Sequence, residues 1–252
     1  MNRLWFAAVV GVVGMAGSVA TAQESTPAKP ESAPSTAPPA APSVEFPHPM
    51  ITEVLYAVPS GDEGDADQNG RRSATGDEFV ELMNPHTKPI TLKGYTLTDG
   101  VVKKGAKSKG EPQIRFVFPE LTLKPGEVVV VFNGSDGPPA GPVGDTKAPA
   151  ARNEKFNNAY VFTMKVKGSF TAFSNEGDCV LLSDPAGKPV ECVRWGEESQ
   201  SPEKAAPRTY DAPESRGSVH REGDEFVPHK NLSGDLGGLP FSPGKVEAAG
   251  KR

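Results

Sequence analysis

The chain has 252 residues and a formal net charge of −5 at pH 7, and 7% of its residues are aromatic. Its 26 prolines and 27 glycines are spread throughout and disfavour long helices. A mildly acidic chain is poorly suited to general binding of nucleic acid, so we expect no nucleic-acid partner.

Residues 1–22 have the three zones of a secretory signal peptide. Arg3 supplies the positive charge, Leu4–Val19 is apolar, and Ala20, Thr21 and Ala22 are small residues suited to cleavage before Gln23. The alternative is a retained anchor, but the apolar run is short for a span of roughly 20 residues and is diluted by Gly and Ser. We expect export to the periplasm, the cell surface or the exterior, with no transmembrane segment after cleavage.

Residues 23–47 form a Pro/Ala/Ser-rich tract with almost no large apolar side chains. Because such a tract cannot repay the entropy of ordering, we predict a disordered linker. Such a linker could act as a spacer that holds the folded domain away from another body. A disordered segment without a function is an equally good interpretation. The remaining chain divides into one domain at 48–245 and a C-terminal tail at 246–252.

Short apolar runs with a period of two indicate β-strands throughout the predicted domain. The expected strands are Met50–Tyr56, Glu78–Asn84, Pro89–Asp99 with a break at Gly94, Ile114–Pro119, Glu127–Phe132, Asn158–Val166, Ser169–Phe173, Asp178–Asp184, Lys188–Trp195 and Gly217–Arg221. Long loops separate some of them at Ala57–Asp77, Gly134–Asn157 and Gly196–Arg216, and the last two read as flexible. The pattern predicts an all-β antiparallel sandwich or barrel.

The two cysteines suggest one disulfide, since the chain is expected to be exported. A four-residue turn over Asp184–Gly187 would place Ser183 opposite Lys188. Counting outward then places Cys179 directly opposite Cys192, where Cα atoms about 4.5 Å apart can be bridged. The alternative is a pair of free thiols that face each other.

Several segments, in order, resemble the lamin-tail domain family. They are "ITEVLY" (Ile51–Tyr56), "DEFVELMNPHTKPITLKGYTLTD" (Asp77–Asp99), "FPELTLKPGEVVVVF" (Phe118–Phe132), "SNEGDCVLLSDPAGKPVECVRWG" (Ser174–Gly196) and "GSVHR" (Gly217–Arg221). Phe226–Lys245 is similar to the family's closing segment. The resemblance implies an immunoglobulin-like antiparallel β-sandwich that mediates binding and contributes no catalytic residues. With an export signal and no coiled-coil rod, the chain looks like the secreted bacterial form.

The loop that begins "DADQNG" at Asp65 resembles the start of a calcium loop, with oxygen ligands at positions 1, 3 and 5 and glycine at position 6. Position 12 is Gly76, which cannot close the coordination shell, so a following carboxylate would have to turn back. The alternative is a polar surface loop whose Asp, Asn and Gly residues only form turns. The candidate ligands are Asp65, Asp67, Asn69, Asp77, Glu78 and the backbone carbonyl of Arg71.

Other chemistry finds less support in the sequence. The four lysines between Lys103 and Lys109 fit a solvated loop better than a phosphate-binding site. The histidines, at positions 48, 86, 220 and 229, lack the spacing of zinc-binding motifs, and no serine lies in a G-x-S-x-G motif. We therefore predict that the protein is not an enzyme and that it has either no cofactor or calcium.

Together these features predict a non-catalytic exported binding or structural module whose partner is an unidentified protein or envelope polymer. The alternative is a calcium-dependent adhesion or envelope-associated module organised by the Asp65–Glu78 loop. A hydrolase or nuclease accessory protein is the third hypothesis.

Overall fold

The computed structural model describes residues 44–100, 114–135, 137–144, 147–164, 173–196, 206–232 and 234–246. The predicted signal peptide 1–22, most of the linker 23–47, the lysines of 103–109 and most of the tail 246–252 lie outside these residues. Inside the predicted linker, the side chain of Val44 is buried, with 3% exposure. Within the described ranges, no helix has the length and apolar character needed to span a membrane.

Strands and short 3-10 turns are the regular elements of the described chain. The strands are β1 (Met50–Leu55), β2 (Phe79–Met83), β3 (Ile90–Thr91), β4 (Thr96–Asp99), β5 (Arg115–Val117), β6 (Thr122–Leu123), β7 (Val128–Phe132), β8 (Arg152–Asn153), β9 (Ala159–Thr163), β10 (Gly177–Ser183), β11 (Pro189–Gly196), β12 (Arg208–Asp211), β13 (Val219–Glu222) and β14 (Glu225–Pro228). The turns are η1 (Asp62–Gly64), η2 (Glu154–Phe156), η3 (His229–Asn231) and η4 (Gly234–Leu236).

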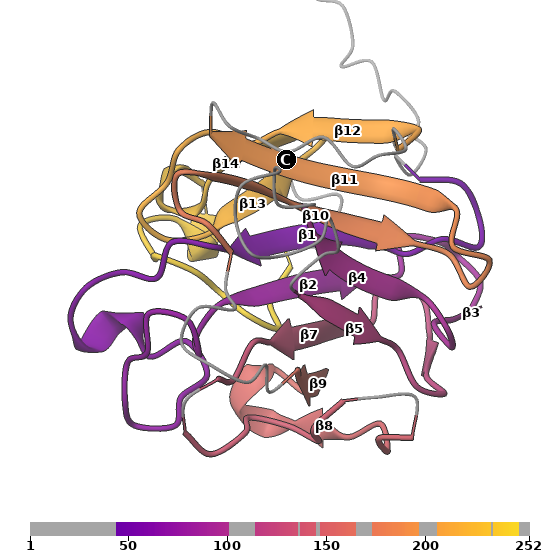
Figure 1. The fold of residues 1–252 in the computed structure, drawn as a ribbon, viewed down its shortest axis with the longest axis horizontal. Coiled ribbons are helices and arrows are strands. Elements are labelled where there is room, and N and C mark those ends of the chain that lie inside the picture. Colours follow the sequence, from indigo (N-terminus) through magenta and orange to yellow (C-terminus); the bar gives the residue numbers. More distant parts are fainter. Residues whose placement is uncertain are drawn as a thin grey trace, which may run out of the picture. The chain divides into compact units, whose positions relative to one another are not determined.

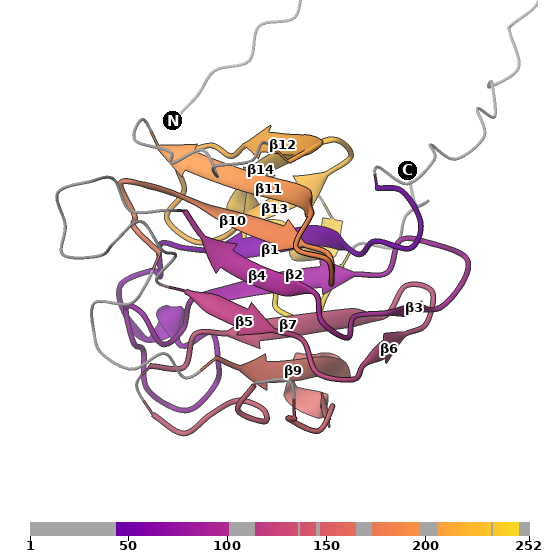
Figure 2. The ribbon, with the colours of Figure 1, turned by 45° about the vertical axis from the view of Figure 1, so that its right-hand side comes forward.

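The strands form two main sheets, which confirms the predicted all-β fold (Figures 1 and 2). The larger sheet has seven strands in the order β14-β13-β1-β2-β7-β9-β8, and the smaller has five in the order β12-β11-β10-β4-β5. A separate pair joins β3 to β6. Neighbouring strands are antiparallel except for β7 with β9 and β11 with β12, which are parallel.

The larger sheet is buried on both of its faces. On β2, Val80 and Leu82 belong to the main core between the sheets, as the alternating sequence predicts. Phe79 belongs to a second apolar cluster with Phe156, against which Phe241 of the closing segment packs. The closing segment therefore covers the face of the sheet that points away from the main core.

β1 contains a β-bulge that strict alternation of the sequence does not predict. Ile51 pairs with Leu82 and Glu53 pairs with Glu81, which leaves Thr52 as an extra residue. Ile51 consequently packs in the main core, whereas Glu53 lies on the opposite face although it is only two residues further along.

A buried ion pair satisfies the backbone at this bulge and joins the two sheets. The Ile51 amide donates to Oε2 of Glu191 on β11 at 2.7 Å, and the Ile51 carbonyl accepts from Nε of Arg221 on β13 at 2.8 Å. Arg221 and Glu191 also pair directly at 2.6 Å, with side chains 3% and 0% exposed. The Arg221 guanidinium stacks on the ring of Tyr210 at 4.2 Å, which adds a cation–π contact.

The hairpin of β10 and β11 forms where the sequence predicts it, but its register is different. The Asp184 amide closes the turn on the Lys188 carbonyl, and an irregularity follows between the pairs of Leu182 and Ser183. Together these move the partner of Cys179 by two residues, from the expected Cys192 to Arg194.

Both cysteines are buried and free, so the predicted disulfide between Cys179 and Cys192 is contradicted. Cys192 lies opposite Leu181 instead. Contact with the Cys192 thiol and burial both raise the pKa of the Cys179 thiol.

β8 and β12, which occupy parts of the loops read as flexible, are further strands that the sequence did not predict.

We expect Glu191→Ala to lower the free energy of unfolding by about 3–5 kcal/mol, because it leaves Arg221 buried without its partner. Urea unfolding of the purified protein measures the loss. Lys93→Ala is the control, since it removes an ion pair with Glu120 in which both side chains are 70% exposed. Its loss should be much smaller because solvent screens an exposed pair, and equal losses would contradict the assigned role of the buried pair.

Candidate functional site

The loop between β1 and β2 brings three carboxylates together. One oxygen of each of Asp65, Asp67 and Asp77 lies within 4.8 Å of the others. Asp67 and Asp77 are buried, with 3% and 0% exposure, and Asp65 is half-buried. Of the two carboxylates that could turn back toward Asp65, Asp77 does so, just ahead of β2.

Backbone amides hold the loop around these carboxylates. Asp65 accepts from the amides of Asn69 at 3.0 Å and Gly70 at 2.9 Å. Asp77 accepts from the amides of Asp67 at 2.9 Å and Ser73 at 2.5 Å. Gly70 has φ +90°, a conformation that suits glycine at this tight turn.

The other predicted ligands are placed less favourably for an ion. The Asn69 side chain donates to Asp67 at 2.8 Å and accepts from the amide of Arg71 at 3.0 Å. Glu78 is not part of the cluster, because it accepts from Nδ2 of Asn133 at 3.0 Å and from the amide of Phe173 at 3.1 Å. Of the six predicted ligands, the structure brings the carboxylates of three together.

The cluster carries more negative charge than its surroundings neutralise. Burial raises the pKa of the Asp67 carboxyl to about 7, and the Asp77 carboxylate adds to this rise. Burial also raises the pKa of Asp77. The nearby Arg72 points elsewhere, since its guanidinium donates to the carbonyls of Pro59 at 2.7 Å and Val58 at 3.0 Å. Such a cluster can bind a proton or a hard cation.

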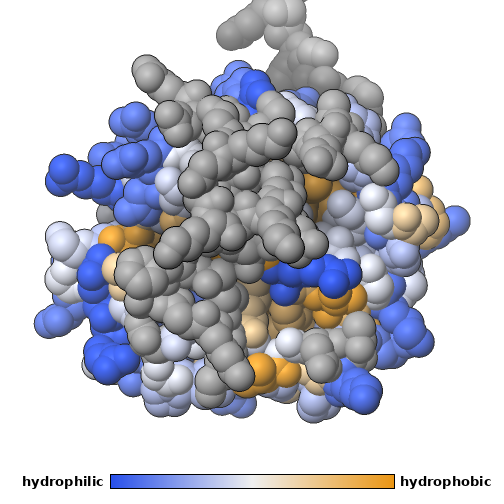
Figure 3. Space-filling model, in the orientation of Figure 1, coloured by the Kyte–Doolittle hydropathy of each residue, from blue (hydrophilic) through white to orange (hydrophobic). Residues whose placement is uncertain are grey.

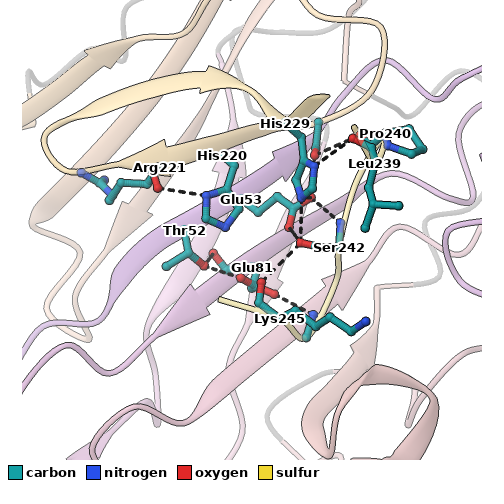
Figure 4. A network of polar contacts seen from close by, with 12 residues as sticks. Thr52, Glu53, Glu81, His220, Arg221, His229, Leu239, Pro240, Ser242 and Lys245 are labelled. Carbon is teal, nitrogen blue, oxygen red and sulfur yellow. Dashed lines mark hydrogen bonds and ion pairs between the residues drawn. The ribbon is translucent and has the colours of Figure 1, made fainter. Parts of the chain in front are cut away.

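A second cluster of polar side chains lies on the outer face of the large sheet, and the sequence analysis missed it (Figure 4). Glu53, Glu81 and His220 each offer a ligand atom within 4.8 Å of the others. His229 lies beside them, with its ring centroid 5.5 Å from that of His220. The histidines appear scattered in the sequence, and only the strand register could have shown that they meet.

Burial governs the protonation of this second cluster. It raises the pKa of Glu53 to about 7, and burial together with the Glu53 charge raises the pKa of Glu81 well above its usual range. Burial lowers the pKa of His220 to about 4, so its imidazole is neutral near pH 7.

The surface offers one further feature, an exposed aromatic side chain at a shallow hollow. Phe46 is 55% exposed and contacts the His86 ring edge-to-face, with ring centroids 5.4 Å apart. Pro85, Thr87 and Lys88 complete the hollow.

On the face drawn in Figure 3, hydrophilic residues dominate the periphery, and hydrophobic residues appear as small separate areas.

Comparison with known proteins identifies the family of the sandwich. A family model described as "Lamin Tail Domain" matches residues 45–197, which is more than half of the 252 residues. No curated protein matches the chain. The match ends after β11, so β12 to β14 and the whole closing segment lie beyond it.

In calcium-free buffer, we expect the stability of the wild type to fall relative to that of Asp67→Asn as pH rises from 5 to 8. The folded-state pKa of Asp67 is about 7 against 3.8 for the free side chain, so the folded state binds the proton more tightly. The stability that this proton on Asp67 contributes to the folded state is complete below about pH 4 and is lost as pH rises through about 7. Asparagine resembles the protonated acid and does not titrate.

Urea unfolding at both pH values measures this difference, which we expect to be on the order of 2 kcal/mol. Asp62→Asn, at an exposed position in η1 of the same loop, is the control and should follow the wild type. Parallel pH dependence of wild type and Asp67→Asn would show that Asp67 is ionised throughout this range.

Proposed function

The chain belongs to the lamin-tail domain family, and on this premise we propose that it is an exported, non-catalytic binding or structural module of the secreted bacterial type. The observation that carries this proposal is the family match across most of the sandwich, since lamin-tail domains are immunoglobulin-like interaction modules. The signal-like residues 1–22 support export to the periplasm, the cell surface or the exterior. The partner is a protein or an envelope polymer.

Phe46 and the hollow beside it are the surface that we assign to the partner. A large aromatic side chain that is 55% exposed is costly to leave in water and provides contact area with little loss of conformational freedom on binding. The hollow also presents the exposed Lys88, which can form a polar contact beside the aromatic centre.

We expect Phe46→Ser to weaken binding of the chain from Gln23 onward to isolated envelope fractions. Loss of an aromatic anchor worth at least about 1 kcal/mol should reduce the affinity about fivefold or more in a sedimentation assay. Leu239→Ser is the control, because Leu239 is another exposed hydrophobic residue, with 40% exposure. Equal binding of wild type and Phe46→Ser would exclude this surface as the partner site.

A second proposed function is a calcium-dependent adhesion or envelope-associated module organised by the Asp65–Glu78 loop. The convergence of Asp65, Asp67 and Asp77 favours it, because calcium prefers carboxylate and carbonyl oxygens and would relieve their mutual repulsion. Calcium takes 6–8 oxygen ligands, so backbone carbonyls such as that of Arg71 and water would complete the shell.

We expect calcium at about 5 mM to raise the midpoint of thermal unfolding relative to excess chelator, because an ion that binds only the folded state stabilises it. A stabilisation of about 1–3 kcal/mol corresponds to a few degrees or more for a domain of this size. Asp65→Asn should abolish the response and the exposed control Asp62→Asn should retain it. An unchanged midpoint of the wild type would dismiss calcium binding.

A further inference from the structure

His220, Glu53 and Glu81 form a row across three neighbouring strands of the large sheet. Glu53 on β1 pairs with His220 on β13 on one side and with Glu81 on β2 on the other. Directly paired residues project from the same face of a sheet, so these three side chains meet. Two opposed glutamates repel each other when ionised, and a buried sheet face does not provide water to screen them.

The hydrogen bond of His220 fixes which of its ring nitrogens has a free lone pair. Nδ1 lies 2.9 Å from the carbonyl of Arg221, which can only accept, so Nδ1 carries the proton. Nε2 is then an acceptor, and it is buried without a hydrogen-bond partner among the described residues. Figure 4 shows the ring with Nδ1 toward Arg221 and the opposite edge toward Glu53 and Glu81. A histidine held by a backbone carbonyl in this way is the usual form of a metal ligand.

The hydrogen bonds of Glu81 keep its carboxylate in place without using all of its capacity. Oε1 accepts from the hydroxyl of Thr52 at 2.6 Å, and Oε2 accepts from the amide of Gly244 at 2.7 Å. Each carboxylate oxygen has two lone pairs, so one per oxygen remains for another partner.

Glu53 is held in the same way from the closing segment and from the residue that precedes β13. Its Oε1 accepts from the hydroxyl of Ser218 at 2.5 Å and from the amide of Ser242 at 3.0 Å. Its Oε2 lies 3.3 Å from the hydroxyl of Ser242. That hydroxyl has one proton, and the Nε2 of His229 competes for it at 2.7 Å, because His229 uses Nδ1 to donate to the carbonyl of Leu239.

From these contacts we propose that Glu53, Glu81 and His220 form a buried site for one divalent transition-metal ion, of which zinc is the representative. Three electron-pair donors converge there when both carboxyls are ionised: Nε2 of His220 carries no proton, and a bound ion would displace any proton from the two carboxyls. Two carboxylates balance a charge of +2, and the neutral imidazole adds a nitrogen ligand of the kind that transition metals favour over calcium.

The proposed site differs from the Asp65 loop in access as well as in ligands. The amides of Ser242 and Gly244 bond to Glu53 and Glu81 from the closing segment, so that segment covers the site. Glycine is required at position 244, where φ is +85° and a Cβ atom would lie 2.2 Å from the carbonyl of Phe156. The ion would therefore enter as the closing segment docks, and chelators would remove it slowly from the folded chain.

The experiment is refolding of the chain from Gln23 onward in the presence of zinc, followed by gel filtration and elemental analysis. We expect about one zinc ion per chain and a higher midpoint of thermal unfolding than for protein refolded with chelator. Calcium in place of zinc should leave this site unfilled. If the wild type refolded with zinc retains none and its midpoint of unfolding is unchanged, the proposal is overturned. Glu53 and Glu81 would then share a proton in place of the ion.

Two variants remove one ligand each and preserve the local hydrogen bonds. Glu81→Gln can still accept from Gly244 and donate to Thr52, and His220→Asn keeps a donor near the position of Nδ1. Each should lower zinc affinity at least about tenfold while keeping the cooperative unfolding transition. His229→Asn is the matched control, at a buried histidine outside the three ligands, and should keep its zinc. Zinc bound equally by the wild type and both ligand variants would also overturn the proposal.

Discussion

The extra residue in β1 is the constraint on which much of the remaining structure depends. It lets Ile51 enter the main core while Glu53 faces the opposite side of the sheet. A bulge frees backbone groups from the strand ladder, and a buried amide or carbonyl without a partner costs about as much as a lost hydrogen bond. Glu191 and Arg221 take up the Ile51 amide and carbonyl, so one local irregularity also connects the two sheets.

The sequence contained enough information to predict the strands whose pattern is local. The alternation in "EFVELMN" correctly assigned Val80 and Leu82 to one face of β2 and Phe79 to the other, and Gly94 marked the break between β3 and β4. The register of β10 with β11 could not be counted from the turn, because an irregularity beside Ser183 changes the pairing. β12 was missed because it depends on parallel pairing with β11, which has no local signature.

The same distinction applies to the candidate sites: one forms within a single loop, and the other forms between strands that are distant in the sequence. Asp65, Asp67 and Asp77 come together through a short loop, and residue spacing was sufficient to suggest it. Asp77 and Glu78 separate ahead of β2, because Asp77 accepts from the amides of its own loop whereas Glu78 accepts from Asn133 and Phe173. The row of His220, Glu53 and Glu81 depends on a bulge and on the pairing of β13 with β1, so it could only be recognised in the folded chain.

The contacts between β1 and the closing segment have a kinetic consequence. Glu53 and Ser242 are bonded across 189 residues of sequence, and Ile51 and Arg221 across 170. Because closing such long loops is entropically costly, contacts of this range slow folding. β1 of the large sheet cannot acquire all its native partners until the residues up to Ser242 have left the ribosome, so we expect this sheet to stay incompletely folded until then. A chain in that state is suited to threading across a membrane before it folds.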